Sequence, residues 1–208
     1  MKKLLIIGLI GILFIGLSFA IKKEYVIYID PGHGGYDGGA TYEDINENQI
    51  VMPVAKSLKN YLTNLGINVK MTREDDVALG DKKIDDLNKR IELMEGSDLY
   101  ISIHANAYTD KKYSGAQVFY SNNNEKNIVI SKSIQNVLCK TTTTTRVNKE
   151  VSGIMLLDGI TTPGCLIELG FLSNDEERNK LIDSNYQDLL AYSIYLGVLE
   201  YLNLNNLI

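Results

Sequence analysis

The sequence predicts a single α/β domain with a largely parallel sheet, and three observations support this prediction. Short apolar runs typical of strands alternate along the chain with longer segments of helical periodicity. Several of these runs are almost continuously apolar, as expected of strands covered on both faces. The 208 residues, with 45% hydrophobic and 23% charged side chains, suffice for one folded core, and no linker-like change of composition divides them.

The predicted strands follow one another at intervals that leave room for helices between most of them. They cover residues 25–30, 67–72, 98–103, 116–120 and 164–168. The first, third and fifth are nearly continuous apolar runs, and we therefore expect helices to cover both faces of the sheet there.

Helical periodicity predicts four helices. The first has one apolar face, on which fall Ile50, Val54, Leu58, Leu62 and Leu65. The second is predicted to be capped by Asp81 and to turn inward Ile84, Leu87, Ile91 and Met94. The third covers roughly residues 125–139, and the last carries an apolar set formed by Leu189, Leu190, Ile194, Leu196 and Leu199.

The N-terminal segment predicts export of the chain. Two lysines precede an unbroken apolar run from Leu4 to Ala20, and small residues at Ser18 and Ala20 suit a signal peptidase. The length of the run lies at the border between a cleaved signal peptide and a short membrane anchor, so both alternatives stay open. We expect residues 1–23 to form this segment and residues 24–208 to form a domain outside the cytoplasmic membrane.

The net charge bears on the class of partner, and the spacing of the cysteines bears on their chemical state. The net charge is −5 and no basic stripe occurs, so nucleic acid is excluded as the expected partner. Cys139 and Cys165 lack C-x-x-C spacing. We expect two small buried apolar side chains, and a disulfide between them stays open.

Both histidines of the chain lie just beyond apolar strands. His33 follows the strand at 25–30, His104 follows the strand at 98–103, and Glu168 ends the strand at 164–168. Because ligands bind beyond the carboxyl ends of parallel strands, these three side chains are predicted to share one site. Two imidazoles and one carboxylate suit zinc and leave a coordination position open for water. The glycines around His33 lack the lysine of a P-loop, so they are expected to permit a sharp turn there.

A third metal ligand is expected among the acidic residues near His33. The candidates are Asp30, Asp37, Glu43, Asp44 and Glu47. Glu47 stands where the first helix would begin, which favours a charged carboxylate. Pro53 complicates this position, because a helix from Glu47 would lose an internal hydrogen bond there. The helix could instead begin near Met52, and the residues alone leave the choice of ligand open.

Five segments in order carry a resemblance to a known family. They are IDPGHGGYDGGA (29–40), ENQIVMPVAKSLKNYLTNLGINVKMTRE (47–74), LNKRIELMEGSDLYISIHANA (87–107), SGAQVFY (114–120) and PGCLIELGFLSN (163–174). On these segments the chain resembles the zinc-dependent N-acetylmuramoyl-L-alanine amidases of the Amidase_3 type. The resemblance implies a twisted, mostly parallel six-stranded sheet with helices on both faces.

The resemblance also implies the site and the reaction. Zinc would be held by His33, Glu47 and His104, and Glu168 would be the catalytic carboxylate. The implied substrate is peptidoglycan bearing stem peptides, cleaved between N-acetylmuramic acid and L-alanine. The short, single-domain, membrane-targeted form is most similar to the spore-cortex members of the family, which act in the muramic-δ-lactam pathway. A location in the wall or the forespore intermembrane space follows, and the need for a partner protein stays open.

The resemblance leaves the roles of some residues undecided, and alternative functions remain. Asp158 stands roughly where the family often has an arginine, which leaves local substrate contacts open. Arg90 is expected to brace the ligand loops, and Asn106 could do the same or touch substrate. Glu168 could instead pair with Arg90. The alternative functions are an inactive peptidoglycan-binding scaffold and a zinc peptidase acting on free peptides.

Overall fold

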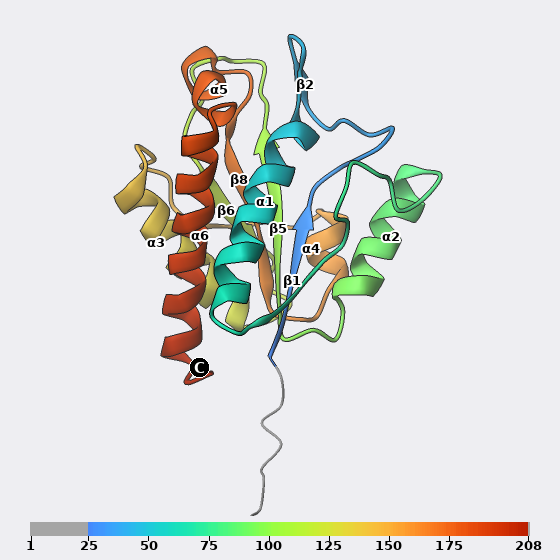
Figure 1. The fold of residues 1–208 in the computed structure, drawn as a ribbon, viewed down its shortest axis with the longest axis vertical. Coiled ribbons are helices and arrows are strands. Elements are labelled where there is room, and N and C mark those ends of the chain that lie inside the picture. The colour runs from blue at the N-terminus through green and yellow to red at the C-terminus, as the bar shows by residue number, and fades with distance from the viewer. Residues whose placement is uncertain (1–24, 208) are drawn as a thin grey trace, which may run out of the picture.

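A computed structural model describes residues 25–207 of the chain. The predicted export segment, residues 1–23, lies outside the described residues. The chain forms a six-stranded sheet in the order β4-β1-β5-β8-β6-β7, with helices on both faces (Figure 1). The predicted fold class is confirmed.

The sheet is parallel except at one pair of strands. Its members are β1 (Val26–Pro31), β4 (Asn68–Met71), β5 (Leu99–Asn106), β6 (Gln117–Tyr120), β7 (Lys149–Glu150) and β8 (Gly164–Phe171). Only β6 and β8 run antiparallel among the pairs of this sheet in the described chain. A separate hairpin joins β2 (Thr41–Tyr42) and β3 (Ile45–Asn46). The five predicted strands are present.

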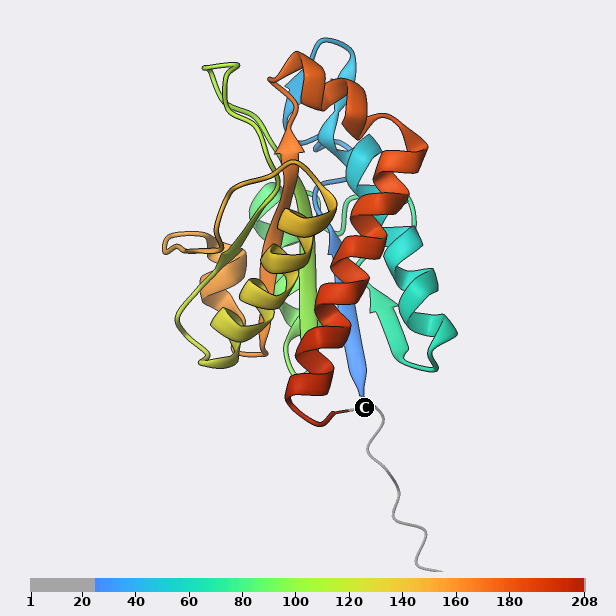
Figure 2. The same ribbon diagram turned by 90° about the vertical axis from the view of Figure 1, so that its left-hand side faces the viewer.

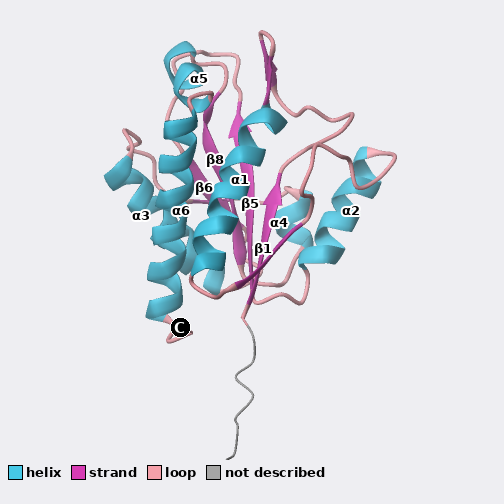
Figure 3. Cartoon of the chain, in the orientation of Figure 1, coloured by secondary structure: helices cyan, strands magenta, loops and turns pink. Residues whose placement is uncertain are grey.

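Helices form a layer on each side of the sheet (Figures 2 and 3). The larger layer consists of α1 (Glu47–Asn64), α3 (Lys126–Thr141) and α6 (Ser184–Leu204), which share the main apolar core with the strands. The opposite face carries α2 (Lys83–Met94) and α4 (Met155–Gly159), which pack over Tyr100 and Leu166. The short helix α5 (Asp175–Leu181) follows β8.

Helix α1 begins at Glu47, so the alternative of a start near Met52 is wrong. The backbone N–H of Asn46 donates to Gln49 Oε1 at 3.2 Å, which satisfies one donor at the helix start. Pro53 lies inside the helix and cannot donate to the carbonyl of Gln49. The first turn persists because contacts outside the helix, described below, fix the Glu47 side chain.

Helix α2 departs from the sequence prediction in two ways. It begins at Lys83, and no side chain caps it, so the prediction of Asp81 as the cap is wrong. Ile84 is half exposed, because the first turn extends past the apolar cluster that Met94 joins. Arg90, by contrast, is buried although its position on an amphipathic helix gave no sign of this.

The two cysteines differ in their exposure to solvent. Among the described residues both cysteines are free thiols, and Cys165 is buried as predicted, whereas Cys139 is exposed at the end of α3. None of the described helices has the length and apolarity needed to cross a membrane. The end of α6 lies beside the start of β1, at the edge of the sheet opposite to the one that bears His33 (Figures 1 and 2).

Candidate metal centre

The predicted site residues come from adjacent parallel strands that end at one edge of the sheet. His33 follows β1, and His104 lies near the end of β5, which pairs with β1. Glu168 on β8 is the register partner of His104 on β5. Because paired positions of neighbouring strands point to the same side of a sheet, Glu168 and His104 share a face. The structure thus brings both histidines and the carboxylate to one region.

Glu47 completes a compact cluster with the two histidines. One ligand atom from each of His33, Glu47 and His104 lies within 4.8 Å of the others. Glu47 Oε2 is 3.1 Å from His33 Nε2, and Glu47 Oε1 is 2.8 Å from His104 Nδ1. The imidazole rings meet edge to face, with centroids 5.0 Å apart. These atoms converge although their residues come from three different elements.

The Glu47 carboxylate is fixed from several sides. Its Oε2 accepts the backbone N–H of Ala40 at 2.9 Å, and its Oε1 accepts the backbone N–H of Ala105 at 2.9 Å. Burial alone would raise the pKa of Glu47, but the contacts with His104 and His33 outweigh it and hold the pKa far below its usual value. The buried side chain is therefore ionised, and the ionised carboxylate is the form that ligates metals.

The other acidic candidates do not join this cluster. Asp30 is fully buried and accepts hydrogen bonds from Thr72 and Ser102, and it pairs with Arg90. Glu43 pairs with Arg178, and Asp44 is exposed. Asp37 lies beside the cluster, with Oδ2 at 3.0 Å from His33 Nδ1 but without the alignment of a hydrogen bond to that nitrogen.

Two glycines let the His33 loop close around the cluster. A Cβ at Gly32 would lie 2.3 Å from the His104 ring, so the backbone passes directly over that imidazole. A Cβ at Gly39, where φ is +76°, would lie 2.6 Å from Glu47 Oε2. His33 itself has φ of +60°, a left-handed conformation that few residues with a side chain adopt. The glycines thus permit the predicted sharp turn, and in addition they let the backbone approach the ligand side chains closely.

Within residues 25–207, the carboxylate of Glu168 lacks a hydrogen-bond partner for one of its oxygen atoms. Its Oε2 is buried and accepts no hydrogen bond from any described residue. Burial raises the pKa of Glu168 to about 7. His104 and His33 act in the opposite direction, but their effect is smaller than that of burial. The alternative pairing with Arg90 is wrong, since Arg90 binds Asp30 and Asp86 instead.

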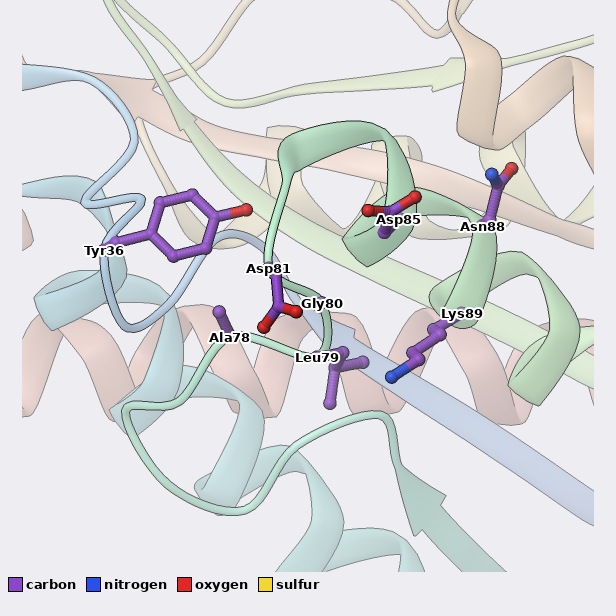
Figure 4. A pocket seen from close by; sticks show the side chains of 8 residues that line it. All are labelled: Tyr36, Ala78, Leu79, Gly80, Asp81, Asp85, Asn88 and Lys89. Atoms are coloured by element: carbon purple, nitrogen blue, oxygen red, sulfur yellow. The ribbon is translucent and has the colours of Figure 1, made fainter.

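Two cavities lie along α2, and the smaller one adjoins the cluster. A small cavity of about 40 Å³ touches both histidines, Arg90 and Leu156 of α4. A wider cavity of about 710 Å³ lies between the His33 loop and α2, with Tyr36 on one wall and the carboxylates of Asp81 and Asp85 on another (Figure 4). The small cavity reaches both histidines, whereas none of the residues that line the wider cavity belongs to the cluster.

The two remaining positions of interest have defined contacts. Asp158 accepts hydrogen bonds from Ser121 Oγ at 3.0 Å and from the backbone N–H of Gly153 at 2.6 Å, so its side chain is occupied in holding the α4 loop. The carbonyl of Asn106 accepts the backbone N–H of Leu172 at 2.7 Å, which ties the ends of β5 and β8 together.

The donor set fits zinc. Two imidazoles and one ionised carboxylate are the ligands of known catalytic zinc sites, in which a fourth position stays open. The His33 Nδ1 atom is buried and makes no aligned hydrogen bond within the described chain. The pKa of His104 is raised, because the Glu47 carboxylate outweighs the effect of burial. A divalent cation would replace the protons that these groups otherwise share.

Comparisons with known proteins agree on one family. The family model described as N-acetylmuramoyl-L-alanine amidase matches residues 27–200. The germination-specific N-acetylmuramoyl-L-alanine amidase of Bacillus subtilis is 43% identical over 187 residues, which cover 85% of this chain and 79% of that protein.

Solved structures show the same relationship. The CwlD amidase of Clostridioides difficile, determined in complex with the GerS lipoprotein, has a TM-score of 0.83 at 34% identity and covers 86% of this chain and 99% of its own. An N-acetylmuramoyl-L-alanine amidase of Clostridium difficile 630 has a TM-score of 0.78 at 30% identity, covering 86% and 97%. With these matches and the converging side chains, the chain belongs to the N-acetylmuramoyl-L-alanine amidase family.

Proposed function

We propose that this protein hydrolyses the amide bond between N-acetylmuramic acid and L-alanine in peptidoglycan, with one zinc ion held by His33, Glu47 and His104. The observation that carries the proposal is the convergence of these ligand atoms within 4.8 Å, on the face of the sheet that Glu168 shares. Family membership supplies the bond that is cleaved.

Glu168 is the proposed catalytic carboxylate. His33, Glu47 and His104 would hold the zinc ion, which would act as a Lewis acid and lower the pKa of a bound water to about 7. Glu168 accepts the proton as water attacks the amide carbonyl, and it then delivers that proton to the leaving nitrogen of L-alanine. The C–N bond breaks, and the products are a lactyl carboxylate and a free amine. The buried and unpaired Oε2 of Glu168 suits this transfer, since no described hydrogen bond has to be broken first.

The biological setting is proposed from the relatives. A germination-specific amidase and a CwlD amidase are among the similar proteins, which supports a role in spore-cortex modification toward muramic-δ-lactam. A wall location agrees with cell-wall amidases among the relatives. We propose that residues 1–23 direct or anchor the chain there. The GerS complex of the CwlD relative supports a lipoprotein as the class of partner.

One experiment tests the reaction. Purified protein with stoichiometric zinc is incubated with spore-cortex and vegetative peptidoglycan, and with free stem peptide, and the products are identified by mass spectrometry. The proposal predicts release of peptides with a free L-alanine amine from peptidoglycan. Cleavage of free stem peptide alone would indicate a zinc peptidase, and stoichiometric zinc with no cleavage of any substrate would indicate a scaffold.

A further inference from the structure

We propose that Arg73 and Arg90 are positioning residues that hold the loop Pro31–His33 in the shape that presents His33 to the metal. This inference rests on the proposed metal site and concerns residues outside the ligand set. The two arginines are almost completely buried, with 3% and 2% of their surfaces exposed. They approach the loop from two different elements, the segment after β4 and helix α2.

The contacts engage three consecutive carbonyls of the loop. Arg73 donates from Nε to the Pro31 carbonyl at 2.9 Å and from Nη2 to the Gly32 carbonyl at 2.7 Å. Arg90 donates from Nη1 to the Pro31 carbonyl at 2.8 Å and from Nη2 to the His33 carbonyl at 2.6 Å. No carbonyl from Pro31 to His33 lacks a guanidinium donor.

The loop needs such donors because its backbone is unfavourable without them. His33 has φ of +60°, and the next residue, Gly34, has φ of +128°. An L-residue in the left-handed region is disfavoured, so a free loop would relax toward other conformations. Relaxation would turn the His33 imidazole away from Glu47, from which its Nε2 is 3.1 Å distant. The guanidinium groups stabilise the strained conformation and thereby the ligand geometry.

Both arginines are themselves held in place. Arg90 pairs with Asp30 Oδ1 at 2.7 Å and with Asp86 Oδ1 at 2.6 Å. Arg73 Nη1 donates to the carbonyl of Asp75 at 2.9 Å. A guanidinium has five donors in a rigid fork, whereas lysine offers one ammonium, so lysine cannot reproduce these divergent contacts. A charge-conserving change to lysine therefore separates the geometry of the donors from their charge.

The test measures zinc affinity apart from stability. Wild type and the Arg73→Lys and Arg90→Lys variants are titrated with zinc against a chromophoric chelator, and the melting temperature of each metal-free protein is recorded. The control is Arg178→Lys, since Arg178 is also buried and donates to the Leu172 carbonyl at 3.1 Å but does not contact the His33 loop. We expect zinc to bind about 10–100-fold more weakly to the loop variants. The control should bind zinc within twofold of wild type at a similar loss of melting temperature.

Other outcomes overturn the proposal. Loop variants that bind zinc as tightly as wild type, even with lower melting temperatures, would make the arginines a structural brace only. If the lysine variants do not fold, the Asp30→Asn/Arg90→Met double variant removes both buried charges together and must still show the loss of affinity. Absence of zinc binding by the wild type would overturn the proposed function and this inference together, whereas wild-type binding with unaffected variants would overturn this inference alone.

Discussion

At the scale of single residues, the proposed site contains a carboxylate that no hydrogen-bond donor among the described residues stabilises. Glu168 is partly buried, its buried Oε2 accepts no hydrogen bond within the described chain, and burial raises the pKa of the carboxyl to about 7. A carboxylate in such a position is costly for the fold. It therefore fits a group kept for proton transfer rather than for structure.

The Glu168→Gln substitution tests this role. The amide keeps the size of the side chain but cannot accept and return a proton, so we expect the rate of peptide release to fall by about 10²–10⁴-fold. Zinc should remain bound at one equivalent, as measured by metal analysis, because Glu168 is not one of the proposed ligands. Full activity of the variant would remove Glu168 from the mechanism.

Gly39 gives a second test at the same scale. Alanine there would place its Cβ 2.6 Å from Glu47 Oε2, whereas alanine at Gly66 would meet nothing within 4 Å. The φ angles are similar, +76° and +79°, so both changes share a backbone cost of about 1–2 kcal/mol, to which the clash at Gly39 adds. Only Gly39→Ala should also weaken zinc binding, measured by chelator competition. Equal zinc affinity in the two variants would show that Gly39 serves only the turn.

At the scale of elements, a buried ion pair joins the sheet to one of its helices. Asp30 at the end of β1 binds Arg90 of α2, and the hydroxyls of Thr72 and Ser102 donate to the same carboxylate. Burial alone would raise the pKa of Asp30, but Arg90 and these hydroxyls outweigh it and hold the pKa below its ordinary value. The pair therefore fixes α2 against the His33 loop only while Asp30 is ionised.

This lowered pKa has a consequence for stability against pH. A group whose pKa is lowered by folding contributes stability above its unfolded value of about 3.9, and that contribution is lost as the pH falls through the folded value. Urea unfolding should show that Asp30→Asn loses about 3–5 kcal/mol at pH 7, since Arg90 is left buried without its partner. The difference from wild type should shrink below about pH 3.9. A constant difference down to the pH of acid unfolding would contradict the lowered pKa.

At the scale of the whole molecule, the proposed metal centre adjoins the main apolar core without contributing a side chain to it. The main apolar core is formed by strands and by helices α1, α3 and α6, and none of its buried members is a proposed ligand. The fold should therefore persist without metal, with an unchanged far-ultraviolet circular dichroism spectrum after chelation.

Metal removal should nevertheless lower the melting temperature. Zinc at about 100 times its dissociation constant stabilises the native state by about 2.7 kcal/mol, which corresponds to roughly 5–10 °C for a domain of this size. Calorimetry with and without chelator measures the shift. The His104→Ala variant is the control and should show no zinc-dependent shift, because a ligand is missing. A shift as large as that of wild type would show that the ligand set is wrong.

The sequence predicts the fold and part of the site for identifiable reasons. The long strands show apolar periodicity, whereas β2, β3 and β7 have two residues each, which is too short for a periodic signal. The ends of parallel strands placed His33, His104 and Glu168 together. Glu47 needed the resemblance, because its anchors, Ala40 and Ala105, are tertiary contacts and Pro53 argued for a later helix start.

The burial of Arg90 could not be predicted from local pattern. An arginine on an amphipathic helix is ordinarily solvated, and its partner Asp30 lies 60 residues earlier in the chain. The exposure of Cys139 could not be predicted from local pattern either. Cys139 lies in the last turn of α3, where its thiol donates to the carbonyl of Arg146 in the following loop.

The first and last described residues lie on one side of the molecule, away from the proposed metal centre. Tyr25, just before β1, interacts with Tyr201 near the end of α6, at the end of the strands opposite to the histidines. Any tether, fusion partner or affinity tag attached at either end therefore departs from the side opposite the reactive groups. A molecule held to a surface in this way would present its open edge outward, toward a polymer meshwork standing above that surface.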